Sequence, residues 1–261
     1  MTRLPTLFIS HGSPMLAIQD SPAHQFLRHL GQTVPRPKAI LVASAHWESM
    51  GAPAVSTVAH PDTIHDFGGF PRALFEIAYP APGAPETAAH VAVLLEQGGY
   101  TVKVSATRGL DHGAWVPLRL MYPDADIPVT QVSIVRDATP AAHLRLGQAL
   151  ASLRDEGVLV IGSGSLTHNL SEFRGQPVDT VAPAWVRDFG VWMHERLAQG
   201  DTASLLDYRK QAPHAVRNHP TDEHLSPLFV AMGAAGDKAS ATRLHDSFEY
   251  GVLAMDVYAF A

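Results

Sequence analysis

The sequence predicts an α/β fold built on a buried, mostly parallel sheet. Apolar runs of strand length recur along the chain and are continuous rather than alternating, which is typical of strands buried on both faces. Helical patterns lie between several of these runs, as expected where crossover helices join parallel strands. The last apolar run follows a helical region and could pair in the antiparallel direction, which would make the sheet mixed.

Six apolar runs and six helical patterns make up this prediction. Strands are expected at residues 6–10, 39–45, 101–106, 129–134, 158–162 and 251–260. Helices are expected at residues 22–32, 84–99, 139–157 and 183–200, after His112, and from Thr221 and Asp222 through the apolar residues 228–235. Pro85 stands near the start of its helix, and glycines at 98, 157 and 200 stand where helices end, as the boundary preferences of these residues predict.

Composition narrows the class of protein. With 261 residues, 46% of them hydrophobic and 17% charged, the chain is expected to form one globular domain over residues 1–261. A net charge of −6 gives no reason to expect nucleic acid or an anionic membrane as partner. The sequence contains no cysteine, which excludes disulfides and thiolate sites, and it shows neither a secretory signal nor a membrane span. We expect a cytoplasmic protein, and the sequence does not predict its oligomeric state.

Three histidines follow apolar runs at positions where open α/β sheets place their sites. His11 comes directly after the first run, His46 after the second, and His168 a few residues after the fifth. Because ligands bind beyond the carboxyl ends of parallel strands, we expect these three side chains to lie near one another. Neutral imidazole is the commonest protein ligand for zinc and also suits iron, so a metal site is the leading interpretation.

A metal site needs three or four ligands, and the segment 218–236 offers the next candidates. His219 and His224 flank an expected helix start at Thr221 and Asp222, where the helix dipole favours neutral imidazole. Either histidine could instead only form a hydrogen bond with a loop carbonyl.

Two loops add further histidines. His112 lies between Asp111 and Gly113, just before an amphipathic helix. His65 lies beside Asp66 in a loop rich in Gly, Phe and Pro that is long enough to be a lid or pocket wall. We expect His65 and His112 to contact a substrate, although His65 could also be a surface residue of its loop.

Familiar nucleotide-binding and hydrolase motifs are incomplete. The stretch GSGSLT at 162–167 has Thr167 where a dinucleotide-binding loop needs its third glycine. The same stretch has Gly164 where a nucleophile elbow needs serine. Ser163 and Ser165 are therefore interpreted as hydrogen-bonding residues that position His168.

Six sequence blocks together resemble the class III extradiol ring-cleavage dioxygenases, and within them the 4,5-DOPA dioxygenase branch. They occur in order between residues 11 and 229, so the resemblance covers nearly the whole chain. The blocks are HGSPM (11–15), SAHWE (44–48), IHDFGGFP (64–71), GLDHGAWVPL (109–118), GSGSLTHNL (162–170) and HPTDEHLSPLF (219–229).

The resemblance implies a three-layer α/β/α fold and one mononuclear divalent metal. It implies His11, His46 and His224 as metal ligands, His168 as an acid/base that can also close on the metal, and His112 as a second pocket histidine. The broader family uses two histidines and a glutamate around iron(II), whereas here the third position is His224, with Glu223 beside it. This pattern fits the DOPA branch and leaves iron or zinc open as the bound metal.

The expected activity is opening of a catechol ring, such as that of DOPA, with O₂. Three protein ligands on an octahedral iron(II) ion leave positions for both catechol oxygens and for O₂. Two alternatives stay open. A zinc-dependent hydrolase on the same fold would use a metal-bound hydroxide, since zinc has no redox chemistry. A non-catalytic zinc-binding protein would require no chemistry of His168.

Overall fold

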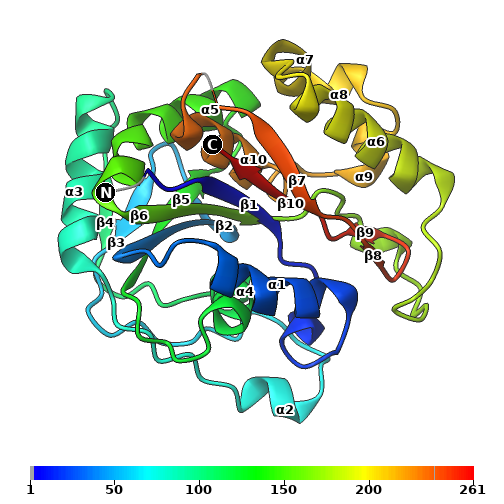
Figure 1. The fold of residues 1–261 in the computed structure, drawn as a ribbon, viewed down its shortest axis with the longest axis horizontal. Helices are drawn as coiled ribbons and strands as arrows, with labels where there is room; N and C mark the ends of the chain where they lie inside the picture. The colour runs from blue at the N-terminus through cyan, green and yellow to red at the C-terminus, as the bar shows by residue number, and fades with distance from the viewer. Residues whose placement is uncertain (1–2, 238) are drawn as a thin grey trace.

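A computed structural model describes residues 3–237 and 239–261. Within them, eight strands form one mixed sheet in the order β4-β3-β5-β2-β6-β1-β10-β7, and β8 and β9 form a small second sheet (Figure 1). The strands are β1 (Thr6–Ser10), β2 (Ala39–Ser49), β3 (Ala54–Ser56), β4 (Lys103–Ser105), β5 (Val129–Val135), β6 (Val158–Gly164), β7 (Ala241–His245), β8 (Phe248–Glu249), β9 (Leu253–Ala254) and β10 (Val257–Phe260).

Helices connect and cover these strands. The longer α-helices are α1 (Pro22–Thr33), α3 (Pro85–Gln97), α4 (His112–Met121), α5 (Pro140–Ala149), α6 (Ala184–Ala198) and α10 (Ser226–Ala235). Short helices are α2 (Arg72–Phe75), α7 (Thr202–Leu206), α8 (Tyr208–Gln211) and α9 (Ala215–Asn218), together with the 3₁₀ turns η1 (Pro14–Ala17), η2 (Ala151–Glu156) and η3 (Leu170–Glu172). No helix in the described ranges is both long enough and apolar enough to cross a bilayer.

The centre of the sheet is parallel, as the sequence predicts. Strand β2 pairs in parallel with both β5 and β6, and β6 pairs in parallel with β1. The antiparallel strand β10 extends the sheet beyond β1, which confirms that the last apolar run makes the sheet mixed. The carboxyl ends of β1, β2 and β6 therefore meet at one edge of the sheet.

Burial on both faces explains the continuous apolar strands. In β1, Leu7 and Ile9 belong to a core with α1 and α4, whereas Phe8 belongs to a core with α6 and α10. In β2, Leu41 packs in a core on the α3 and α5 side. Since successive side chains of a strand point to opposite faces, the sheet lies between two helical layers, and the expected α/β/α architecture is confirmed (Figure 1).

Several expected elements are shorter or interrupted in the structure. The run 251–260 is not one strand, because residues 250 and 251 form a left-handed turn, and the chain passes from β9 into β10 across the buried Asp256. The helical pattern 139–157 continues past α5 only as a 3₁₀ turn. The run 101–106 yields only the exposed edge strand β4.

The helix expected from Thr221 and Asp222 begins later. Helix α10 starts at Ser226, and residues 223–225 form a turn before it. Asp222 does not cap this helix, because its carboxylate accepts hydrogen bonds from Tyr208 and Arg209. His224 therefore lies in a turn ahead of α10, and burial rather than a helix terminus sets its charge.

Candidate metal centre

His11 lies at the carboxyl end of β1, and its ring is fixed by Ser163 of β6. Gly12 follows with φ +60°, a conformation suited to glycine, and a side chain there would collide with Met255. The Ser163 hydroxyl donates its hydrogen to the Gly113 carbonyl, so it can only accept from His11 Nδ1, which lies 3.0 Å away. His11 therefore carries its hydrogen on Nδ1 and presents a lone pair on Nε2.

His46 lies within β2, which extends four residues beyond the expected strand end. The pairing of β2 with β5 shifts register between Ser44 and Glu48, an irregularity of the kind that redirects side chains next to active sites. Nδ1 of His46 lies 3.4 Å from Asp66 Oδ2, and its Nε2 lies 3.0 Å from His11 Nε2.

Asp66 decides which nitrogen of His46 carries the hydrogen. Burial alone would raise the pKa of Asp66, but hydrogen bonds from the side chain and backbone of His112 outweigh it and lower the pKa to about 2. The ionised carboxylate favours hydrogen on the His46 nitrogen that faces it, Nδ1. The Nε2 atoms of His11 and His46 then present lone pairs to each other, an arrangement that a shared cation stabilises.

His224 supplies the third ring. Its Nδ1 lies 2.9 Å from Glu223 Oε1, while its Nε2 is buried and has no hydrogen-bond partner among residues 3–237 and 239–261. Gly164 lets this turn approach β6, since a Cβ at Gly164 would lie 2.1 Å from the His224 carbonyl oxygen. That carbonyl accepts a hydrogen bond from Ser165 N at 2.8 Å, so Ser165 positions the turn of His224.

The three rings fit a metal ion. One ligand atom from each of His11, His46 and His224 lies within 4.8 Å of the others. Two nitrogens that each lie about 2.1 Å from one ion at a right angle are about 3.0 Å apart, the separation found between His11 and His46. Burial lowers the pKa of His46 to about 4 and those of His11 and His224 well below their usual value, so all three are neutral at pH 7.

His168 lies against this centre. Its ring stacks on that of His224, with centroids 3.4 Å apart and planes 8° apart, and burial lowers its pKa to about 4. Its backbone N–H donates to the Asn218 carbonyl at 3.1 Å. His168, Glu223 and His224 form a second group of possible ligand atoms within 4.8 Å, so His168 has the geometry of either a proton carrier or a further ligand.

His112 begins α4, where Asp111 caps the helix through a hydrogen bond from Ala114 N. Nδ1 of His112 donates to Asp66 Oδ1 at 2.9 Å, which leaves Nε2 available to a ligand. Asp111 is fully buried, and Arg108 and Ser44 both donate to its carboxylate. Asp66 therefore connects His112 to His46, and Asp111 fixes the turn that carries His112.

A cavity of about 340 Å³ borders the centre. Its polar wall consists of His46, Asp66, His112, His168 and His224. Its remaining lining residues are Gly12, Ser13, Pro14, Phe67, Phe70, Leu170 and Leu253. The structure thus brings an apolar pocket directly against the histidine cluster.

His65 and His219 occupy other places. His65 lies outside the lining of this cavity, its Nε2 3.0 Å from the Ile77 carbonyl oxygen, whereas the next two residues of its loop do line the cavity. His219 is fully buried, with Nε2 2.8 Å from the Leu166 carbonyl oxygen, which is the carbonyl-binding alternative considered for it. Ser163 positions His11 rather than His168.

Comparisons with known proteins identify relatives along nearly the whole chain. The family model described as the catalytic LigB subunit of aromatic ring-opening dioxygenase matches residues 5–260. A Beta vulgaris protein named 4,5-DOPA dioxygenase extradiol is 48% identical over 98% of this chain and 96% of its own length. A protein of the same name from Escherichia coli K12 is 40% identical over 97% of this chain and 93% of its own.

A solved structure shares the fold. The crystal structure of an uncharacterized protein from Escherichia coli K12 matches with a TM-score of 0.84 and 33% sequence identity, covering 99% of this chain and 100% of that one. Both the family model and the relatives span nearly the whole sequence. The chain therefore belongs to the LigB family of extradiol, aromatic ring-opening dioxygenases, which are metal-dependent enzymes.

Proposed function

We propose that His11, His46 and His224 hold one divalent ion through their Nε2 atoms and that the working metal is iron(II). The supporting observation is the convergence of three neutral imidazoles, each with an oxygen atom facing its Nδ1 and with one ring nitrogen of each within 4.8 Å of the others. Iron(II) bound there would supply the open positions that a catechol and O₂ need.

We further propose a catechol such as DOPA as the substrate. Relatives that carry the name 4,5-DOPA dioxygenase are 40% and 48% identical to this chain over nearly its full length. The cavity beside the histidines has a volume suited to a small aromatic molecule, and Phe67 and Phe70 offer ring faces and edges for it to pack against.

His168 and His112 carry the protons in this proposal. His168 is neutral at pH 7, and no described residue forms a hydrogen bond with its ring nitrogens, so it can accept a proton from a catechol hydroxyl. His112 lines the cavity and is oriented by Asp66 through Nδ1, which leaves Nε2 available to exchange a proton with a substrate oxygen. General acid–base catalysis by such groups typically contributes about 10²- to 10⁴-fold.

The test is anaerobic reconstitution of the metal-free protein with iron(II), followed by a catechol panel that includes DOPA and then O₂. We expect O₂ uptake and a yellow ring-opened product in equal amounts. The zinc-loaded protein is the matched control and should consume no O₂, because zinc has no redox chemistry. Absence of uptake across the panel, or hydrolysis of ester or amide substrates by the zinc form, would contradict the proposal.

A further inference from the structure

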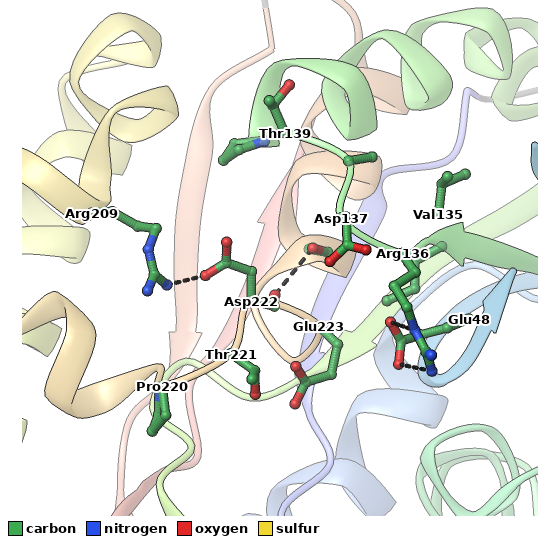
Figure 2. A pocket seen from close by; sticks show the side chains of 14 residues that line it. Glu48, Val135, Arg136, Asp137, Thr139, Arg209, Pro220, Thr221, Asp222 and Glu223 are labelled. Atoms are coloured by element: carbon green, nitrogen blue, oxygen red, sulfur yellow. Dashed lines mark hydrogen bonds and ion pairs between the residues drawn. The ribbon is translucent and has the colours of Figure 1, made fainter. Parts of the chain in front are cut away.

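The segment 218–224 carries the proposed ligand His224 and is held from outside the histidine cluster by α8. Arg209 Nη1 donates to Asp222 Oδ1 and, at 3.1 Å, to the His219 carbonyl oxygen. Tyr208 Oη donates to the same Asp222 oxygen at 2.8 Å. We call Tyr208, Arg209 and Asp222 the Arg209 clamp; Figure 2 shows Arg209 and Asp222 facing each other across the wall of a second cavity.

The same segment is joined to the turn that carries His168. His168 N donates to the Asn218 carbonyl, and the Asn169 side chain donates to the Arg217 carbonyl at 2.6 Å. The His219 ring contacts the Leu166 carbonyl. Asn218 and His219 are fully buried, so water cannot replace the contacts that these two residues form.

The Arg209 clamp therefore holds the segment that carries His224, and hydrogen bonds join the turn of His168 to the same segment. The clamp fixes the segment at Asp222 and at the His219 carbonyl, two residues before and five residues before His224. The stacked rings of His168 and His224 come from the two hydrogen-bonded segments, at the carboxyl end of β6. A shift of the segment would change the separation of these rings, because both rings are attached to it.

We propose that Arg209 and Tyr208 are positioning residues, which act through Asp222 and the His219 carbonyl to hold His224 and His168 in the geometry that binds the metal and moves protons. This rests on the proposed function for the roles of the two histidines. Arg209 and Asp222 are both partly exposed, at 35% and 40% of their side chains. Such a pair contributes little to overall stability, so its main effect is expected at the histidines.

The ion pair of Arg136 and Glu48 provides a matched control. It lines the same cavity and is also partly exposed, with Arg136 Nε 3.2 Å from Glu48 Oε2. Figure 2 shows the two side chains joined by dashed lines. It joins β2 to the residue after β5 and, among the described residues, forms no hydrogen bond or ion pair with segment 218–224. The charge of Glu223 acts on Arg136 only through space, without a hydrogen bond. Arg209→Ala and Arg136→Ala therefore remove the same charge from one cavity, but only the first releases the segment.

The experiment measures cobalt(II) affinity, by competition with a chelator, and the visible spectrum of the cobalt(II) protein. Loss of partners outside the ligand shell typically weakens metal binding about 10- to 100-fold. We expect a loss in this range and an altered spectrum for Arg209→Ala, partial recovery for Arg209→Lys, and less than a twofold change for Arg136→Ala. Arg209→Ala and Asp222→Ala should be non-additive, with the double variant no worse than the more impaired single one.

Tyr208→Phe removes only the hydroxyl that donates to Asp222 and tests the proposal even if Arg209→Ala does not fold. It should weaken cobalt(II) binding less than Arg209→Ala does. Wild-type cobalt(II) affinity and spectrum in folded Arg209→Ala, or equal losses in Arg209→Ala and Arg136→Ala, would overturn the proposal. These readouts need no catechol. If wild-type protein binds the metal but opens no catechol, the proposed function fails while the positioning role still stands or falls by cobalt(II) binding.

Discussion

Two cavities are lined in part by segment 220–224 and differ in the charge of the side chains around them. His224 lines the inner cavity of about 340 Å³, whereas Pro220, Thr221, Asp222 and Glu223 line the outer cavity of about 690 Å³. Burial keeps the rings of His46, His168 and His224 neutral in the inner cavity, whereas Arg136–Glu48 and Arg209–Asp222 form partly exposed ion pairs in the outer one. Burial therefore keeps the proposed metal ligands of the inner cavity neutral, while a partly exposed ion pair of the outer cavity positions the segment that carries His224.

Removal of a proposed metal ligand should have the largest effect on metal binding. His11→Ala removes one Nε2 atom and the ring N–H that donates to Ser163, so metal content and activity should fall to background. The loss should exceed the roughly 10- to 100-fold that removal of an outer partner costs. Metal analysis after desalting checks this, with His90→Ala, an exposed histidine paired to Glu156, as control. Full metal content in His11→Ala would refute the site.

Removing His168 separates proton transfer from metal binding. His168→Ala should lower kcat by about 10²- to 10⁴-fold while most metal is retained, because the ring stacks on His224 without being needed to hold the ion. His112→Ala should show a smaller loss of kcat. Steady-state O₂ uptake with metal quantified in each sample gives the comparison. A loss of metal in His168→Ala as severe as in His11→Ala would instead make His168 a ligand.

Asp66 tests whether orientation of the inner rings matters. Asp66→Asn keeps the size of the side chain but weakens its contacts with His112 and His46. Metal affinity should fall about 10- to 100-fold, and chelator competition measures it. Asp126→Asn, which breaks an exposed pair with Arg36, should leave affinity unchanged. Equal affinities in the two variants would show that the imidazoles are oriented without Asp66.

Acid should destabilise the metal-free protein through the inner rings. Burial lowers the pKa of His46 and His168 to about 4, so these rings are neutral in the fold but protonated in the unfolded chain below about pH 6.5. The unfolded state then binds more protons, and stability falls between about pH 6.5 and 4, by up to about 3 kcal/mol for one such histidine.

Urea unfolding of the metal-free protein at several pH values measures this effect. His168→Ala should make the free energy of unfolding less steeply dependent on pH than it is in the wild-type protein. An unchanged slope in His168→Ala would show that this ring is not held neutral by the fold.

Local signals predicted the sheet and the histidine cluster. The apolar runs at β1, β2 and β6 are long enough to be read from the sequence, and a histidine close after each run places His11, His46 and His168 at one edge. The short strands β3, β7 and β8 lack such runs. Pairing with strands distant in the sequence creates β3 and β7, and β8 forms a short antiparallel pair with the next strand, β9.

Side-chain direction in irregular loops was beyond sequence reasoning. In the loop at 64–71, the sequence favoured His65 as a substrate contact, whereas Asp66 and Phe67 line the cavity. An irregular loop has no periodicity that predicts which side chain points inward. The oxygens that fix the rings, on Ser163, Asp66 and Glu223, come from three separate segments. Only Glu223 carries a local signal, since it adjoins His224.

X-ray absorption spectroscopy of the iron(II)-loaded protein tests the central claim most directly. The shared Nε2 site predicts one iron per chain with at least three imidazole nitrogens at about 2.1 Å, and loss of this imidazole scattering in His11→Ala. Iron bound with no imidazole signature, or a signature unchanged in His11→Ala, would contradict the assignment of the three histidines as its ligands.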